Sequence, residues 1–202
     1  MRRIGAVILA AGMSRRMGVP KLFLEVHGKP LFRHSVECAI QSQLDPILIV
    51  GGEHVHLLHE HTRDLSVEII KNSEYAKGMA TSLQRGVEAL TGRVDALLVF
   101  LADQPFVPPM LVRKLLQTYA DWRSHGIQIV RPQYSGIPGH PVLFDAELFS
   151  EFSDLKGDEG GRLIISRHAA KLKLIPAEQS LWGADIDTPD DLKKWETSFP
   201  PT

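Results

Sequence analysis

The feature that most constrains the fold of this 202-residue chain is a regular alternation of short apolar runs with longer amphipathic segments. The early apolar runs are continuous and rich in β-branched residues, as in parallel strands that are covered on both faces. This alternation predicts an α/β fold with three layers, a mostly parallel sheet flanked by helices. The expected strands are residues 4–9, 47–50, 67–70, 96–101, 127–131, 141–144 and 172–175, and the expected helices are 31–43, 55–62, 79–90, 108–124, 146–152, 161–167 and 189–195.

Length, charge and composition narrow the class of protein further. The length suits a single domain over residues 1–202. The 23 Lys and Arg residues nearly balance the 24 Asp and Glu residues, which excludes a strongly basic nucleic-acid binder. Cys38 is the only cysteine, which excludes an intrachain disulfide and a four-cysteine zinc site. Because no apolar run approaches the roughly 18 residues of a membrane span, we expect no contact with a membrane. The balanced charge likewise leads us to expect no contact with nucleic acid.

The N-terminus has some features of a secretory signal, because Arg2 and Arg3 precede an apolar stretch that ends in small residues. Further basic residues follow that stretch at once, which is unusual after a cleavage site. The same stretch is also typical of a buried strand that enters a glycine loop. We therefore expect the mature chain to begin near Met1 and the protein to be cytoplasmic.

The segment after the first apolar run, residues 9–21, reads Leu-Ala-Ala-Gly-Met-Ser-Arg-Arg-Met-Gly-Val-Pro-Lys. Its small residues allow the backbone N–H groups to approach a ligand closely, and its cations suit an anionic phosphate chain. The residues concerned are Ala10, Ala11, Gly12, Arg15, Arg16 and Lys21. The segment matches neither a Walker A loop nor G-x-G-x-x-G. Phosphate binding is favoured here over the alternative, a tight turn with solvated cations.

Carboxylates lie next to two of the expected elements and predict a metal site. Asp103 comes after the run 96–101, and Asp185 and Asp187 precede the last expected helix. Such carboxylates are the usual oxygen ligands of Mg²⁺. Asp187 or Thr188 has the alternative role of capping that helix. Asp103 has no such alternative, because no helix begins directly after it, and it is therefore the stronger candidate.

Histidines are grouped in two places. Four of them lie within residues 54–61, but their order matches no zinc-protease motif, so a solvated helix face is favoured over a zinc site. His140 lies in the Pro- and Gly-rich segment 132–141, which predicts a loop that borders a site. Cys38 lies among apolar residues of an expected helix and is predicted to be an inert core thiol.

Six motifs in chain order resemble those of the nucleotidyltransferases related to the molybdenum-cofactor enzymes. They occupy residues 9–21, 75–83, 101–105, 139–141, 157–162 and 185–192, so the resemblance extends over nearly the whole length of the chain. The chain is most similar to the cytidylyltransferase branch, which includes relatives described as xanthine dehydrogenase maturation factors.

The resemblance implies a Rossmann-like nucleotidyltransferase fold and a specific reaction. In that reaction CMP passes from CTP to the terminal phosphate of molybdenum cofactor (molybdopterin), and pyrophosphate is released. On this resemblance, the product would serve the maturation of a molybdenum hydroxylase such as xanthine dehydrogenase, and a transient contact with the apoprotein would follow. The cofactor of the reaction is Mg²⁺.

The resemblance also implies roles for particular residues. Arg16, Lys21 and Asp103 would act in catalysis, with Arg16 and Lys21 on the nucleotide phosphates. The nucleotide site would comprise Leu9, Ala10, Ala11, Gly12, Lys21, Asn72, Gly78 and Ser82. Asp103 and Asp187 would hold Mg²⁺, and Gly139 and His140 would lie on the acceptor side.

One residue bears on the base of the nucleotide. The guanylyltransferase branch resembles Leu-Ala-Gly-Gly in the first loop, whereas residues 9–12 here read Leu-Ala-Ala-Gly. The methyl group of Ala11 narrows the space and favours a pyrimidine, by about 1–3 kcal/mol for one methyl. The alternatives are a guanylyltransferase, a sugar-phosphate nucleotidyltransferase, and a non-catalytic cofactor carrier or insertion factor. The presence of Lys21, Asp103 and Asp187 argues against a carrier, which needs no metal site.

Overall fold

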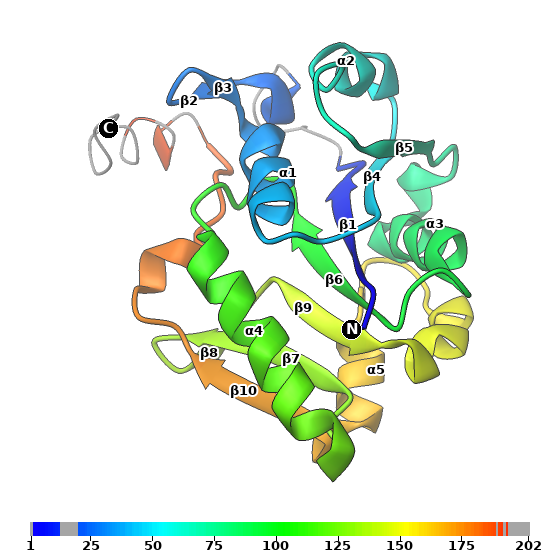
Figure 1. The fold of residues 1–202 in the computed structure, drawn as a ribbon. Coiled ribbons are helices and arrows are strands. Elements are labelled where there is room, and N and C mark those ends of the chain that lie inside the picture. Colours follow the sequence, from blue (N-terminus) through cyan, green and yellow to red (C-terminus); the bar gives the residue numbers. More distant parts are fainter. Residues whose placement is uncertain (1, 13–19, 189, 192, 194–202) are drawn as a thin grey trace.

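The computed structural model describes residues 2–12, 20–188, 190, 191 and 193. Its centre is one mixed sheet that crosses the molecule (Figure 1). The first strand, β1 (Ile4–Ala10), lies in the middle of this sheet and pairs in parallel with β4 (Ile47–Gly51) and β6 (Ala96–Leu101). These three strands are buried along most of their length, because their apolar runs pack against helices on both faces.

The remaining strands extend the sheet on both sides. Beyond β4, the strand β5 (Glu68–Lys71) continues the parallel order. Beyond β6, the strand β9 (Val142–Asp145) runs antiparallel to β6 and to its other neighbour, β7 (Ile129–Tyr134). The strand β10 (Leu172–Pro176) ends the sheet on that side and is parallel to β7.

One face of the sheet carries three helices, whose buried residues pack with Ala6 and Ile8 of β1. They are α1 (Leu31–Gln41), α2 (Val55–Glu60) and α4 (Pro109–Trp122). Cys38 lies within α1, where burial raises the pKa of its thiol to about 12, as expected for a core thiol.

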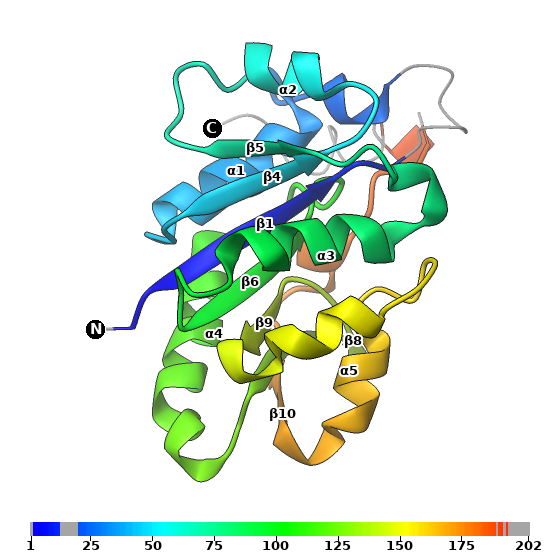
Figure 2. The ribbon, with the colours of Figure 1, turned by 90° about the vertical axis from the view of Figure 1, so that its right-hand side faces the viewer.

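The other face carries α3 (Met79–Leu90), the 3₁₀ segment η4 (Ala146–Asp154) and α5 (Arg162–Arg167). Their apolar side chains pack with Val7 of β1, which points to the opposite face from Ala6 and Ile8. Figure 2 shows α3, η4 and α5 in front of the sheet. The predicted three-layer α/β/α architecture is therefore confirmed.

Two hairpins were not expected from the sequence. Residues 132–141 are predicted as a loop, but β7 continues to Tyr134 and pairs with the short strand β8 (Ile137–Pro138). Ser135 and Gly136 have φ of 47° and 88°, the left-handed values of a two-residue hairpin turn. A second hairpin joins β2 (Glu25–Val26) to β3 (Lys29–Pro30).

The seven expected strands are all present, and their ends differ from the predicted ends by three residues at most. The expected helix at 146–152 is instead the 3₁₀ segment η4. The expected helix at 189–195 lies largely outside the described residues. Of the helices that the structure describes, none has the length and apolar character needed to cross a membrane.

Candidate active site

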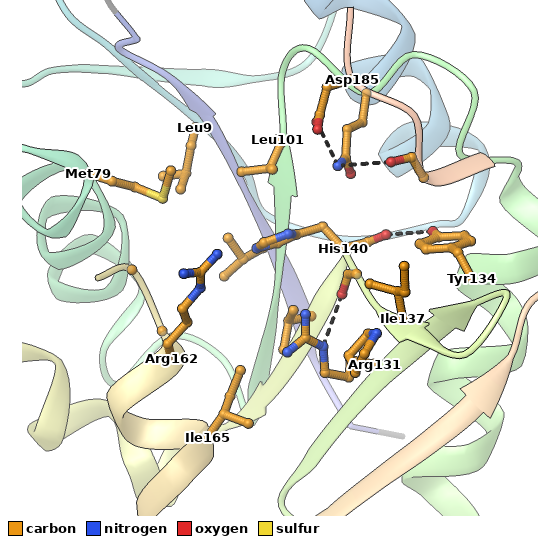
Figure 3. Close-up of a pocket in the computed structure, with 18 of the residues that line it drawn as sticks. Leu9, Met79, Leu101, Arg131, Tyr134, Ile137, His140, Arg162, Ile165 and Asp185 are labelled. Atoms are coloured by element: carbon orange, nitrogen blue, oxygen red, sulfur yellow. Dashed lines mark hydrogen bonds between the residues drawn. The ribbon is translucent and has the colours of Figure 1, made fainter. Parts of the chain in front are cut away.

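Two adjoining cavities open where β1 and β6 end. The small cavity has a volume of about 230 Å³ and is lined by Leu9, Ala11, Gly12, Tyr75, Ala76, Gly78, Met79, Ser82, Leu101, Asp103 and Asp158. The large cavity has a volume of about 830 Å³, and Figure 3 shows the side chains around it. Leu9, Met79, Leu101 and Asp158 line both cavities. This place, at the carboxyl ends of parallel strands, is where open α/β sheets bind their ligands.

Most of the residues predicted to bind nucleotide lie around the small cavity. Leu9, Ala11, Gly12, Gly78 and Ser82 line it. The side chain of Ala10 packs in the core on the other side of β1, so only the backbone of this residue remains for a ligand. Arg16 lies outside the described residues.

Asn72 lies behind the wall of the small cavity and is fully buried. Its side-chain amide donates to Thr81 Oγ1 at 2.8 Å and to Ser82 Oγ at 2.9 Å. Its carbonyl oxygen accepts the backbone N–H of Glu74 at 2.9 Å. All polar groups of this side chain are therefore used to hold the turn before α3, and Asn72 positions Ser82.

Gly78 is required by the backbone at the start of α3. Its φ is +113°, a value that favours glycine, and a Cβ there would lie 2.4 Å from the backbone of Gly157. The segment 157–161 is fixed at this point, because Ala80 N donates to Gly157 O at 2.9 Å and Met79 N donates to Asp158 Oδ1 at 3.0 Å. The motif glycine therefore allows two loops of the site to touch.

Lys21 connects the two carboxylates that the sequence predicts as metal ligands. Its Nζ lies 2.9 Å from Asp103 Oδ2 and 2.8 Å from Asp187 Oδ1. Burial lowers the pKa of Lys21, but both carboxylates raise it by a larger amount, so the pKa lies above its ordinary value and the ammonium is charged. Residues separated by 82 and 166 positions in the sequence thus meet at one point.

The segment that carries Asp187 is attached to the end of β6. Ile186 N donates to Asp103 O at 3.1 Å, which sets the two carboxylates side by side. Thr188 and Asp191 form a capping box: Thr188 N donates to Asp191 Oδ2 at 2.9 Å, and Asp191 N donates to Thr188 Oγ1 at 3.1 Å. Of the two candidate caps, Thr188 is therefore the one observed, and the Asp187 carboxylate faces Lys21.

Asp185 lies beside this centre and borders the large cavity. Its Oδ1 accepts a hydrogen bond from Gln104 Nε2 at 2.9 Å. Burial raises the pKa of Asp185, and the negative charges of Asp103 and Asp187 raise it further. The hydrogen bond from Gln104 lowers the pKa, but by less, so it lies above its ordinary value.

The donor chemistry of the Asp103 and Asp187 pair suits Mg²⁺. In the part of the chain that the structure describes, no group of three or more His, Cys, Asp and Glu side chains is arranged to hold a metal ion alone. Mg²⁺ needs no such group, because it binds through one or two carboxylates and takes its other ligands from water and phosphate.

The large cavity contains a basic group of side chains, Arg131, His140 and Arg162. Figure 3 shows the imidazole of His140 and both guanidinium groups turned toward the cavity. Arg131 Nε donates to Gly139 O at 3.1 Å. Among the described residues, neither guanidinium has a carboxylate within ion-pair distance.

Burial and positive charge act together on these groups. Burial lowers the pKa of His140 to about 4, and the charges of Arg131 and Arg162 contribute, so the imidazole is neutral near pH 7. Burial and the charge of Arg162 also lower the pKa of Arg131. The sequence analysis missed both arginines as site residues, although Arg162 ends the motif 157–162 and Arg131 precedes the segment 132–141.

Curated relatives match almost the full chain. Molybdenum cofactor cytidylyltransferase of Escherichia coli (strain K12) is 28% identical and aligns over 95% of this chain and 94% of its own length. Purine catabolism protein PucB of Bacillus subtilis (strain 168) is 31% identical over 92% of both chains. Nicotine blue oxidoreductase of Paenarthrobacter nicotinovorans is 27% identical over 94% of both chains.

Solved structures share the fold. A nucleotidyl transferase from Methanothermobacter thermautotroptrophicus superposes with a TM-score of 0.81, at 23% identity over 97% of both chains. Rv0371C of Mycobacterium tuberculosis H37Rv, in complex with manganese, gives a TM-score of 0.76 at 22% identity, over 98% of this chain and all of its own. The family profile of the MobA-like NTP transferase domain matches residues 6–172. Since that match covers most of the chain, and the cavities lie at its strand ends, this protein belongs to the MobA-like NTP transferase family.

Proposed function

We propose that the protein transfers CMP from CTP to the terminal phosphate of molybdenum cofactor and releases pyrophosphate. The observation that carries this proposal is the cluster of Lys21, Asp103 and Asp187 beside the small cavity, which Asp103 lines, with Asp185 of the same segment on the large cavity. A reaction between two phosphorylated substrates needs positive charge close to both, which Lys21 and a metal ion on the two carboxylates would supply together. The match to the Escherichia coli cytidylyltransferase supports this choice of substrates.

The nucleotide would occupy the small cavity. The backbone around Ala10–Gly12 would bind the nucleotide at the end of β1, and Ser82 would border it, held by Asn72. Lys21 would contact the phosphates together with Arg16, because Mg²⁺ on Asp103 and Asp187 would compensate the carboxylates with which the ammonium now pairs.

Asp103 and Asp187 would hold Mg²⁺. When bound, this ion would neutralise phosphate charge and orient the triphosphate. The protein's contribution is the fixed spacing of the two carboxylates, which the hydrogen bond from Ile186 N to Asp103 O maintains.

The acceptor would occupy the large cavity. Its volume of about 830 Å³ suits a substantial organic molecule, and its walls combine apolar side chains with the basic group of Arg131, His140 and Arg162. Guanidinium groups that have no carboxylate partner among the described residues are suited to an anionic acceptor. Gly139 would contribute its backbone, which Arg131 holds in place.

The reaction itself requires no strong general base. A phosphate monoester is already anionic near pH 7, so its oxygen attacks the α-phosphorus directly as the bond to pyrophosphate breaks. The main barrier is the approach of two polyanions. Lys21 and, on the acceptor side, Arg131 and Arg162 would lower that barrier by their positive charge.

The proposed product would serve the maturation of a molybdenum hydroxylase such as xanthine dehydrogenase. The transfer of a finished cofactor to its apoprotein would involve a transient contact in the cytoplasm. Ala11 lines the small cavity, and its methyl group there supports CTP over GTP.

The experiment that tests this proposal measures pyrophosphate release with Mg²⁺ and molybdopterin cofactor, using CTP, GTP, ATP and UTP separately. Release with CTP alone is the expected result. An Asp103→Asn variant should lose turnover but keep the fold, and Asp95→Asn is a matched control because Asp95 lies at the opposite end of β6. Release with GTP would instead assign a guanylyltransferase. Tight binding of the cofactor without any release would assign a carrier.

A further inference from the structure

Tyr134 lies between two segments of the site that are distant in sequence. It is the last residue of β7 and is only 7% exposed. We define residues 137–141, which carry His140, as the acceptor loop. We define residues 180–187, which carry Asp185 and Asp187, as the carboxylate segment.

The phenol ring of Tyr134 is fixed to the acceptor loop by two contacts. Its Oη donates to the backbone carbonyl of His140 at 2.5 Å (Figure 3). A Cβ at Gly139 would lie 2.5 Å from Cε2 of the ring, so the backbone of Gly139 packs directly on the ring edge. The loop can take this position only because residue 139 has no side chain.

The same ring edge contacts the carboxylate segment. A Cβ at Gly183 would lie 2.4 Å from Cδ2 and Cε2 of Tyr134. The side-chain amide of Gln104 donates two hydrogen bonds through Nε2, to the carbonyl oxygen of Gly183 at 3.3 Å and to Asp185 Oδ1 at 2.9 Å. The ring therefore lies against the backbone that precedes Asp185 and Asp187 in the carboxylate segment.

We propose that Tyr134 is a positioning residue that sets the distance between the acceptor loop and the carboxylate segment. This inference rests on the proposed function, in which the acceptor beside His140 meets a nucleotide held at Asp103 and Asp187. The physical reason is that an in-line transfer tolerates little displacement, and an error of about 1 Å costs on the order of 10²-fold in rate. A rigid ring wedged between two glycines maintains that distance better than a flexible side chain.

Kinetics of two Tyr134 variants test the proposal. Tyr134→Phe keeps the ring and loses one hydrogen bond, so we expect a kcat within about threefold of the wild type. Tyr134→Leu loses the ring, and we expect kcat to fall at least tenfold and KM for the acceptor to rise. The dissociation constant of CTP should stay within about twofold, because Tyr134 does not line the small cavity.

Two measurements without turnover separate this inference from the proposed function. They are the affinity of the protein for Mn²⁺ alone, by electron paramagnetic resonance, and the imidazole signals of His140, by NMR. Tyr134→Leu should weaken Mn²⁺ binding several-fold and shift the His140 signals, whereas Tyr134→Phe should leave Mn²⁺ binding unchanged. A change in only one of the two would show that the ring does not couple the segments and would overturn the proposal.

Tyr119→Leu is a matched control, because Tyr119 is also buried, but its Oη donates to Asp145 Oδ2 at 2.6 Å, beside the first residue of β6 and thus at the opposite end of that strand from the site. It should lower stability and leave Mn²⁺ binding and the His140 signals unchanged.

Gly183→Ala should mimic Tyr134→Leu, since the added methyl group displaces the ring. Combined with Tyr134→Ala, which provides space for that methyl, Gly183→Ala should cause little further loss; fully additive losses would contradict the proposal.

If Tyr134→Leu does not fold, Tyr134→Phe and Gly183→Ala still decide the question. Wild-type-like Mn²⁺ binding and His140 signals in a folded Gly183→Ala protein would overturn the proposal. Failure of the wild type to release pyrophosphate would refute the proposed function but leave both binding readouts interpretable.

Discussion

At the scale of single residues, the site depends on how one ammonium group compensates two carboxylates. Lys21 has a side chain only 12% exposed and lies within 3 Å of both Asp103 and Asp187. A partly buried carboxylate pair without a cation is unfavourable, because the two negative charges repel and have lost part of their hydration. In the proposed complex, Mg²⁺ on the two carboxylates would take over this compensation, and the ammonium would then contact the phosphates.

Replacing Lys21 should affect the rate more than CTP binding. In Lys21→Ala we expect kcat to fall by about 10²–10³, since positive charge matters most when phosphate charge develops in the transition state. Steady-state kinetics and a separate CTP titration measure the two effects. Lys29→Ala is the control, because Lys29 is half exposed and pairs with Glu37 at the surface. A weaker CTP affinity at unchanged kcat would contradict this role.

Ala11 should control the choice of base. In Ala11→Gly, the cavity loses one methyl group, and we expect the preference for CTP over GTP, measured as the ratio of kcat/KM values, to fall by at least tenfold. Ala10→Gly is the matched control, because the methyl of Ala10 packs in the core. It should lower stability without changing the ratio. An unchanged ratio in Ala11→Gly would place base selection elsewhere.

At the scale of elements, the strands were predictable because their apolar runs carry the signal directly. The sequence analysis predicted a mostly parallel sheet and did not single out β9 as antiparallel. Residues 135–141, which connect β7 to β9, are too few for the crossover that a parallel pair requires, so this direction was predictable in principle. The hairpin of β7 and β8 was missed because proline-rich sequence is typical of loops, and Pro132 and Pro138 obscure the strand pattern.

The site was predictable to a similar degree. The structure brings Lys21, Asp103 and Asp187 together, and their proximity could be anticipated because each lies in a motif beside an expected element. Arg131 and Arg162 were not, because one arginine on a strand and another on a helix have no local pattern that shows they share a cavity. Asn72 was predicted to bind nucleotide, and only the structure shows that its side chain is used in holding Thr81, Ser82 and the backbone of Glu74.

The contact between α3 and the segment 157–161 should be sensitive to Gly78. Gly78→Ala introduces both strain at positive φ and a clash with Gly157, so we expect a loss of more than about 2 kcal/mol in the free energy of unfolding and a lower rate. Gly92→Ala is the control, since Gly92 also has positive φ, +76°, but no atom lies within 4 Å of the added Cβ. Equal losses in the two variants, measured by denaturant unfolding, would show that the contact with Gly157 contributes nothing.

At the scale of the whole molecule, the buried side chains of Asp145 and His140 should make the free energy of unfolding depend on pH. Asp145 is 1% exposed, and burial opposes its charge, but hydrogen bonds from Glu147 N, Tyr119 and Arg123 lower its pKa below the ordinary value. A depressed carboxyl pKa contributes stability that is complete above the unfolded pKa and is lost as the pH falls through the folded pKa. This contribution therefore disappears only in strong acid, below about pH 4.

His140 acts in a higher range of pH. In the folded protein the pKa of His140 is about 4, whereas the pKa of an unfolded histidine is about 6.5. Between these values the unfolded chain binds a proton that the folded protein does not bind, so the free energy of unfolding decreases as the pH falls from about 6.5 to about 4. The full difference corresponds to at most about 3 kcal/mol, since one pKa unit is about 1.36 kcal/mol.

Replacing His140 should therefore flatten the pH dependence of stability in this range. In His140→Gln we expect the free energy of unfolding, measured by urea titration between pH 7 and pH 4, to lose most of its decline from pH 6.5 to pH 4.5. His59→Gln is the matched control, because His59 is exposed on α2 and its removal should leave the decline in place. An anion such as inorganic phosphate that binds beside Arg131 and Arg162 should reduce the decline in the wild type, because its negative charge favours protonated His140 in the folded state. If the decline persists unchanged in His140→Gln, the buried imidazole is not its cause, and the basic group of the large cavity is more hydrated than the structure indicates.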